Sequence, residues 1–138
     1  MSDADKFILA IDLGTSGPKV ALFSIQGELV GSEFEEIHLF LHPDGGAEQS
    51  PSEWWHAIQK ATQRLLAKDL TRNEEIIAIA LTGQWSGTVA VDAEGNALSN
   101  AIIWMDSRGA PYIHQILKGP LEVQGYGLGK LFKWIRLT

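Results

Sequence analysis

The first third of the chain alternates between short apolar runs and tight-turn residues, a pattern typical of β-strands. Residues 7–11 form a near-continuous apolar run, as expected of a strand that is covered on both faces. A glycine-containing turn separates this run from a second one at 20–23, and a Gln-Gly pair then precedes a more polar third strand at about 28–37. Three strands joined by two tight turns predict an antiparallel meander.

The pattern changes to helical spacing near residue 50. The residues Ser50-Pro51-Ser52-Glu53 match a capping box, with Ser50 as the N-cap, Pro51 at the first helical position and Glu53 reaching back. Apolar residues then recur on one helical face: Trp54, Ile58, Ala61 and Leu65. A second buried strand is expected at 74–82, and the strand–helix–strand order predicts a right-handed crossover into parallel pairing.

The last third of the chain carries weaker patterns. We expect a hairpin over 88–104 and two short helices at about 108–118 and 128–137. The last helix has an apolar stripe that reaches the end of the sequence without a glycine cap or a polar tail. We therefore expect more protein to follow Thr138.

Composition narrows the class of protein. A chain of 138 residues with 45% apolar and 20% charged residues can bury a real core, and it fits one domain or part of a larger one. A net charge of −6 argues against nucleic acid or an anionic membrane as a partner. The absence of cysteine excludes disulfides and thiolate metal sites. No apolar run reaches the roughly 18 residues of a membrane span, and the acidic start is unlike a signal peptide, so we expect a soluble cytoplasmic protein.

The sequence DLGTSGPK, at 12–19, carries the sharpest candidate chemistry. A carboxylate at a strand end, followed by a turn with two glycines, can bring backbone N–H groups and two hydroxyls against a phosphate chain. The carboxylate can also hold Mg²⁺ through water. The candidate phosphate-side residues are Asp12, Gly14, Thr15, Ser16 and Lys19. An ordinary hairpin turn explains the same residues. A Walker A motif does not match the glycine spacing, and a dinucleotide-binding motif would be followed by a helix, whereas a strand follows here.

Two further polar clusters follow apolar runs. The first lies just past the carboxyl end of the predicted strand at 74–82, where ligands bind in α/β sheets. The second places an aromatic face beside a carboxylate and a guanidinium, a combination suited to a sugar. The candidate sugar-side residues are Gln84, Trp85, Ser86, Trp104 and Asp106. Each also has a structural explanation, the tryptophans as core or edge aromatics and Asp106 as the N-cap of the next helix.

Together these segments resemble the opening of an FGGY-family carbohydrate kinase. The matching pieces occur in family order: 11–16, 48–51 with Trp54-Trp55, 81–84, Asp92 with Gly95, and 101–108. The resemblance spans nearly the whole chain, and the stretch Trp-Met-Asp-Ser-Arg at 104–108 is most similar to xylulokinase-like members.

The resemblance implies an α/β fold of the ribonuclease H-like (actin/hexokinase-type ATPase) class, here incomplete, with a mixed sheet. Residues 1–138 would be the N-terminal portion of domain I. The resemblance also implies that the γ-phosphoryl group of ATP is transferred, in the presence of Mg²⁺, to a hydroxyl of a sugar or polyol. A ketose such as xylulose is the favoured acceptor. The phosphate-side residues would then serve ATP and the metal, with Asp12 binding Mg²⁺ through water, and the sugar-side residues would line the substrate pocket.

Two departures from the family pattern leave alternatives open. Trp85-Ser86 stand where glycerol kinases carry Arg-Glu and xylulokinases typically Met-His, so the sugar is not assigned. The family's general base, adenosine pocket and second phosphate loop would lie beyond Thr138, so the isolated chain is expected to be inactive. A non-catalytic binding module that self-associates or pairs with a complementary chain remains possible. An actin- or Hsp70-like ATPase fragment also explains 12–19, although it gives no reason for the cluster at 104–108.

Overall fold

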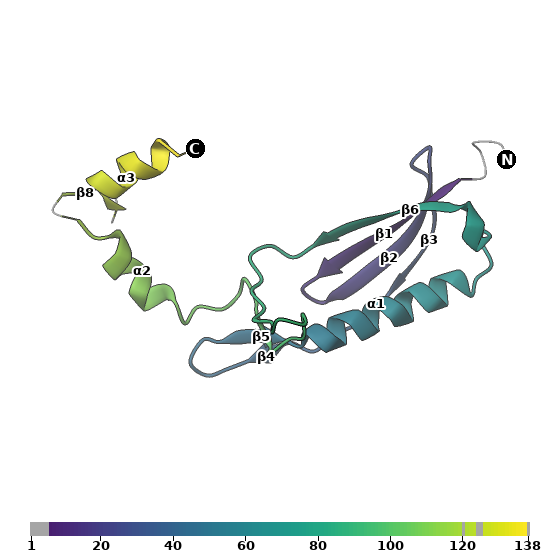
Figure 1. Ribbon diagram of the computed structural model, residues 1–138, viewed down its shortest axis with the longest axis horizontal. Helices are drawn as coiled ribbons and strands as arrows, with labels where there is room; N and C mark the ends of the chain where they lie inside the picture. The colour runs from purple at the N-terminus through teal and green to yellow at the C-terminus, as the bar shows by residue number, and fades with distance from the viewer. Residues whose placement is uncertain (1–5, 120, 124–125, 138) are drawn as a thin grey trace.

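The main sheet of the protein has the strand order β3-β2-β1-β6. The computed structural model describes residues 6–119, 121–123 and 126–137 (Figure 1). The four strands are β1 (Phe7–Gly14), β2 (Gly17–Ser24), β3 (Leu29–Phe34) and β6 (Ile76–Gly83). β2 pairs antiparallel with both β1 and β3, and β1 pairs parallel with β6. The predicted meander and the predicted parallel pairing are therefore confirmed, although β3 ends three residues earlier than expected.

Helix α1 (Pro51–Leu66) covers one face of this sheet (Figure 1). The core between them consists of Leu9, Ile11, Val20 and Leu22 from the strands with Ala61 and Leu65 from the helix. The predicted start of the helix is confirmed, because the Ser50 hydroxyl accepts a hydrogen bond from the Glu53 backbone N–H at 3.4 Å. The Glu53 carboxylate, which the capping box would turn back to Ser50, lies instead 2.5 Å from Nδ1 of His38.

A second, smaller sheet has the order β4-β5-β7 and was not predicted. Its strands are β4 (Phe40–Leu41), β5 (Ala47–Gln49) and β7 (Ala101–Ile102). The hairpin predicted over 88–104 is reduced to two isolated bridges, Thr88 with Ile102 and Val91 with Ala97. A 3₁₀ turn, η2 (Asn73–Glu75), leads into β6. The small sheet matters for the site because it brings residues 47–49 beside residues 101–103.

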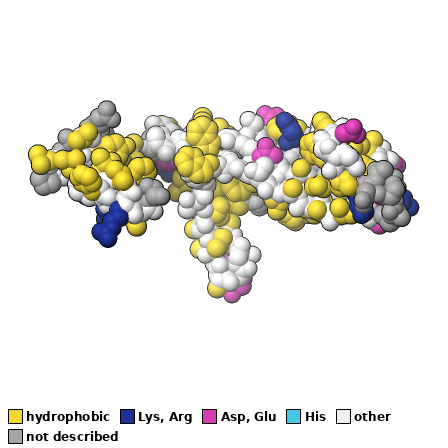
Figure 2. Space-filling view, turned by 90° about the horizontal axis from the view of Figure 1, so that it is seen from above, with side chains coloured by type: hydrophobic (Ala, Val, Ile, Leu, Met, Phe, Trp, Pro, Cys, Tyr) yellow, Lys and Arg dark blue, Asp and Glu magenta, His cyan; other side chains and the backbone are white. Residues whose placement is uncertain are grey.

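The last part of the chain extends away from both sheets (Figure 1). It contains α2 (Ala110–Leu117), β8 (Glu122–Val123), β9 (Tyr126–Gly127) and α3 (Leu128–Ile135). The two predicted helices are confirmed with slightly shorter bounds. Apolar side chains gather on this end of the molecule, at the left of Figure 2, and Ile116, Phe132 and Trp134 are largely exposed. No helix in the described part of the chain is long and apolar enough to cross a membrane.

The turn between β1 and β2 is fixed by a close approach of the backbone. Gly17 has a φ of +144°, and a Cβ atom built on it would lie 1.9 Å from the carbonyl oxygen of Glu35. The segment after β3 is bonded to this turn, because the backbone N–H of Ile37 donates to the Ser16 carbonyl at 3.2 Å. Only glycine fits this position without a shift of one of the two segments.

We expect the substitution Gly17→Ala to destabilise the protein by about 2 kcal/mol or more, because the new methyl group meets backbone atoms that cannot rotate away. Gly14→Ala is the matched control. Its Cβ would meet only the Gly17 carbonyl oxygen, at 3.4 Å, and its φ lies outside the left-handed region. Urea unfolding followed by circular dichroism measures both losses. Equal losses in the two variants would contradict the prediction.

Candidate functional site

The phosphate-side candidates lie at the end of β1 and the start of β2. Asp12 and Lys19 are paired in the antiparallel register, and Thr82 is the parallel partner of Asp12, so the three side chains share one face of the sheet. This is the face opposite α1, since Ile11 and Val20 on the other face pack in the core. The three residues line a hollow of about 300 Å³ whose floor is largely apolar. Asp12 and Lys19 are both exposed there.

The turn itself contacts residues from both sugar-side clusters. The indole Nε1–H of Trp104 donates to Oγ1 of Thr15 at 2.9 Å. The same hydroxyl donates to Oε1 of Gln84 at 3.4 Å. The structure therefore brings together one residue from each of the three clusters that the sequence singled out.

Gln49 is a further residue of this centre that sequence reasoning missed. It is fully buried, and its Nε2 donates to the carbonyl oxygen of Thr15 at 2.6 Å. Its Oε1 accepts from Nε2 of Gln84 at 2.8 Å and from Nε1 of Trp54 at 3.2 Å. The only sequence signal for Gln49 is its place in the family pattern at 48–51.

Three of the five sugar-side candidates line one open hollow of about 560 Å³: Ser86, Trp104 and Asp106. Ser86 has a φ of +55°, in the left-handed region that non-glycine residues seldom adopt. Gln84 and Trp85 are not among the lining residues. Trp85 is 86% exposed, and Gln84 is held in the centre described above. A hollow with an aromatic face and polar groups can receive a small polyhydroxylated molecule.

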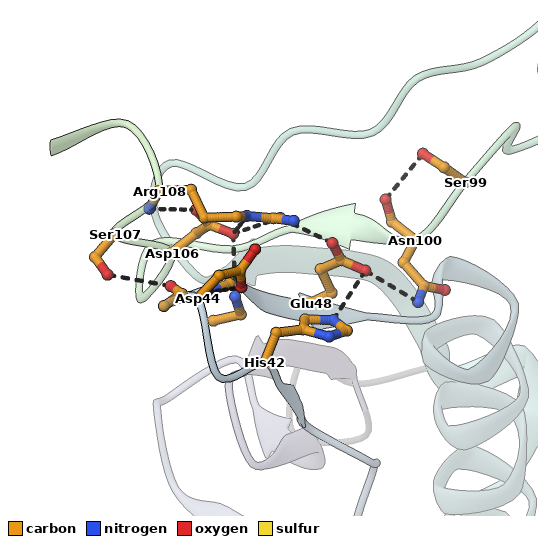
Figure 3. Close-up of polar contacts among 11 residues, drawn as sticks. His42, Asp44, Glu48, Ser99, Asn100, Asp106, Ser107 and Arg108 are labelled. Carbon is orange, nitrogen blue, oxygen red and sulfur yellow. Dashed lines mark hydrogen bonds and ion pairs between the residues drawn. The ribbon is translucent and has the colours of Figure 1, made fainter. Parts of the chain in front are cut away.

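Asp106 forms the middle of a polar cluster (Figure 3). Its Oδ2 accepts from the backbone N–H of Ala47 at 3.0 Å and from Nε of Arg108 at 2.9 Å, and its Oδ1 accepts from the Arg108 backbone N–H at 3.0 Å. Arg108 also donates to Oε1 of Glu48 at 2.8 Å. These bonds, first those from the Arg108 guanidinium, lower the pKa of Asp106 to about 2.

This cluster corrects one expectation about Asp106 and leaves another as a prediction. Helix α2 begins only at Ala110, so Asp106 is not its N-cap. The carboxylate instead ties the turn after β7 to the start of β5, and only 8% of its side chain is exposed. Most of the hydrogen-bonding capacity of this carboxylate is already used within the fold. Its expected contact with a sugar stays a prediction.

The described residues contain no group of three or more His, Asp or Glu side chains that could hold a metal ion together. Asp12 offers a single exposed carboxylate at the end of a strand. Such a group fits Mg²⁺ that is bound mainly by water and phosphate oxygens, which is how this cation usually binds in nucleotide sites.

The mixed sheet, its covering helix and the glycine turn between β1 and β2 match the α/β fold of actin/hexokinase-type ATPases, as solved FGGY sugar kinases have it. The chain belongs to the FGGY family of carbohydrate kinases, since the family model for the N-terminal domain matches residues 7–126.

Individual relatives support this assignment. The chain is 34% identical to a glycerol kinase of Symbiobacterium thermophilum, over 94% of this chain and 28% of the relative. It is 31% identical to a xylulose kinase of Escherichia coli, over 93% of this chain and 28% of the relative. A solved xyloylose kinase from Brucella ovis aligns with a TM-score of 0.71 and 31% identity, over 94% of this chain and 29% of that one. The chain thus spans less than a third of the length of these relatives.

We expect Arg108→Met to raise the pKa of Asp106 from about 2 toward its ordinary value of 3.8, because the bonds from the guanidinium are lost. A lowered pKa stabilises the folded state above the pKa of the unfolded chain, and that contribution disappears as the pH falls through the folded value. The variant should therefore lose less stability than the wild type on acidification from about pH 4 to about pH 2.

Carbon-detected NMR titration of the Asp106 carboxyl measures this pKa directly. Arg72→Met is the control, because the Arg72 guanidinium is bonded to Glu75 in the 3₁₀ turn that leads into β6. An unchanged Asp106 titration in Arg108→Met, or the same change in Arg72→Met, would show that the guanidinium of Arg108 is not the cause.

Proposed function

We propose that the protein containing this chain is an ATP-dependent kinase that transfers a γ-phosphoryl group to a hydroxyl of a sugar or polyol. The observation that supports this most is the hydrogen bond between Trp104 and Thr15. It joins a side chain suited to stacking on a sugar to a turn suited to phosphates, so that donor and acceptor would lie next to each other. Phosphoryl transfer depends mainly on such positioning and on electrostatic stabilisation.

On the phosphate side, the backbone of Gly14, Thr15 and Ser16 would face the phosphate chain, and the exposed ammonium group of Lys19 would add positive charge. Asp12 would hold Mg²⁺ through water, in line with its single exposed carboxylate. ATP would supply the phosphoryl group and Mg²⁺ would neutralise charge on its oxygens. Thr15 would act through its main chain, because its hydroxyl is already bonded to Trp104 and Gln84.

On the sugar side, Trp104 would stack on the apolar face of the substrate while Ser86 and Asp106 contact its hydroxyls in the hollow they line. Gln84 and Trp85 would complete the pocket from the end of β6. A ketose such as xylulose is the acceptor we favour, because the stretch at 104–108 is most similar to xylulokinase-like members and several relatives are xylulose kinases. Glycerol is the main competitor, because several other relatives are glycerol kinases at a similar identity.

We also propose that residues 1–138 form the N-terminal portion of domain I, and that catalysis needs the segments with which the longer relatives continue. A missing general base alone costs about 10²–10⁴-fold in rate. Half of a nucleotide cleft would also leave the phosphates open to water.

A non-catalytic interaction module is the second candidate, and the exposed side chains of β6 favour it. Ile79 and Leu81, the parallel partners of Leu9 and Ile11, lie on the α1 side of the sheet, yet they are 63% and 75% exposed. Such a row of apolar side chains on an outer strand fits a second copy of the chain or a complementary C-terminal portion. A module of this kind would bind a partner without phosphorylating any sugar.

We expect the 138-residue chain alone to form no sugar phosphate at an enzyme-like rate, because the residues proposed here bind and position but include no general base. Incubation with γ-labelled ATP, Mg²⁺ and a panel of ketoses and polyols, followed by chromatography of the products, tests this. Labelled sugar phosphate formed at an enzyme-like rate would refute it.

In a polypeptide extended by the coding sequence that follows position 138, we expect Asp12→Asn to lower the rate of sugar phosphorylation by about 10²–10³-fold, because Mg²⁺ would lose its protein carboxylate. Asp69→Asn, which changes an exposed carboxylate just after the end of α1, is the matched control and should keep the wild-type rate. Equal rates in the two variants would contradict the role of Asp12. Phosphorylation of no member of the panel by the extended polypeptide would favour the interaction module.

A further inference from the structure

The buried amide of Gln49 lies where three segments of the chain meet. It stands at the end of β5, and its hydrogen bonds reach the turn after β1, the residue after β6 and the first turn of α1. No atom of Gln49 is exposed to solvent. The side chain therefore acts on the site only through the residues that it holds.

The orientation of this amide is determined by its partners. The Thr15 carbonyl can only accept a hydrogen bond, so it must face the Nε2 group of Gln49 at 2.6 Å. The Trp54 indole N–H can only donate, so it must face Oε1 at 3.2 Å. Oε1 then accepts a second bond, from the Gln84 amide at 2.8 Å. A side chain without both a donor and an acceptor leaves these groups without partners.

We propose that Gln49 is a positioning residue that holds the Thr15 turn and Gln84 in one geometry and, through the Thr15 hydroxyl, sets the position of Trp104. The proposal rests on the function proposed above, in which the turn serves phosphates and Trp104 serves the sugar. The connection is continuous: Gln49 bonds to the Thr15 carbonyl and to Gln84, Gln84 to the Thr15 hydroxyl, and that hydroxyl to the Trp104 indole. Gln49 thus couples the phosphate side to the sugar side without contacting either ligand.

The alternative is that Gln49 merely satisfies its own neighbours in the core. The two roles differ at Trp104, since no hydrogen bond joins Gln49 to this residue directly. A local role changes Trp54, a direct partner, and leaves the Trp104 indole as it is. A positioning role changes both.

The first test uses Gln49→Met, which keeps a similar volume and removes the hydrogen-bonding groups. The chain has five tryptophans, and each gives one indole N–H signal in a ¹⁵N–¹H spectrum of the ligand-free protein. We expect the Trp54 and Trp104 signals to shift and the Trp104 indole proton to exchange with solvent about tenfold faster, as for one lost hydrogen bond. The Trp134 signal, from α3, should stay in place.

Gln59→Met is the matched control, because it makes the same chemical change at an exposed position of α1. It should leave the Trp104 signal unchanged. A Trp104 signal in Gln49→Met that is identical to that of the wild type would overturn the proposal.

The second test, Gln49→Glu, covers the case in which Gln49→Met does not fold. A protonated carboxyl offers one donor and one acceptor oxygen, so it can replace all three bonds of the amide, and an ionised carboxyl cannot donate. We expect the wild-type position of the Trp104 signal at low pH and its loss as the introduced carboxyl ionises, with the wild-type chain titrated over the same range for comparison. A Trp104 signal that does not follow this titration, or a variant that fails to fold even at low pH, would overturn the proposal.

These signals are read without nucleotide or sugar. A protein that phosphorylates no sugar would therefore contradict the proposed function and leave the coupling through Gln49 standing. An unaffected Trp104 signal would remove the coupling and leave the kinase function as it was.

Discussion

The parallel pairing of β1 with β6 is the constraint on which the candidate site depends. Parallel strands end at the same edge of a sheet, and here Leu13 is paired with Gly83, with the backbone N–H of Gln84 donating to the Leu13 carbonyl at 2.8 Å. The chain reverses into β2 just after β1, so the Thr15 turn stands directly beside Gln84, 69 positions further along the sequence. The hydrogen bonds of Gln49 and Trp104 in this centre depend on the two strand ends lying side by side.

Elements with a strong hydrophobic pattern could be predicted from the sequence, and those formed by distant partners could not. The apolar runs of β1 and β6 and the capped amphipathic helix α1 were found at nearly their observed bounds. Strands β5 and β7 have three and two residues, too few to show a period, and each exists because the other lies beside it, as Gln49 pairs with Ala101. The third strand was predicted too long because the segment after Phe34 turns to bond the β1–β2 turn, a contact that leaves no trace in the local sequence.

The same distinction holds for the site. Residue type and strand-end position were enough to single out Thr15, Gln84 and Trp104, which the structure joins by hydrogen bonds. They could not show that the carboxylate of Asp106 is bonded to the backbone of Ala47, 59 positions away, in place of capping the next helix. A lone glutamine has no spacing that indicates a role, and the family pattern at 48–51 does not say what Gln49 does, so its role could be inferred only from its neighbours in space.

Surface ion pairs and buried hydrogen bonds between neutral groups stabilise different parts of this structure. The ion pairs of Glu33 and Glu35 with Arg64 join β3 and the residue just after it to α1 at the surface. Bonds from Lys68 and Arg64 lower the pKa of Glu33, and bonds from Arg64 and Lys60 lower that of Glu35, so this support is present near neutral pH and is lost in acid. Exposed pairs of this kind are also weakened by salt. The centre around Gln49 is held by hydrogen bonds between neutral groups, which neither salt nor moderate acid removes directly. The geometry that places Trp104 beside the Thr15 turn is therefore less sensitive to salt and acid than the surface ion pairs between β3 and α1.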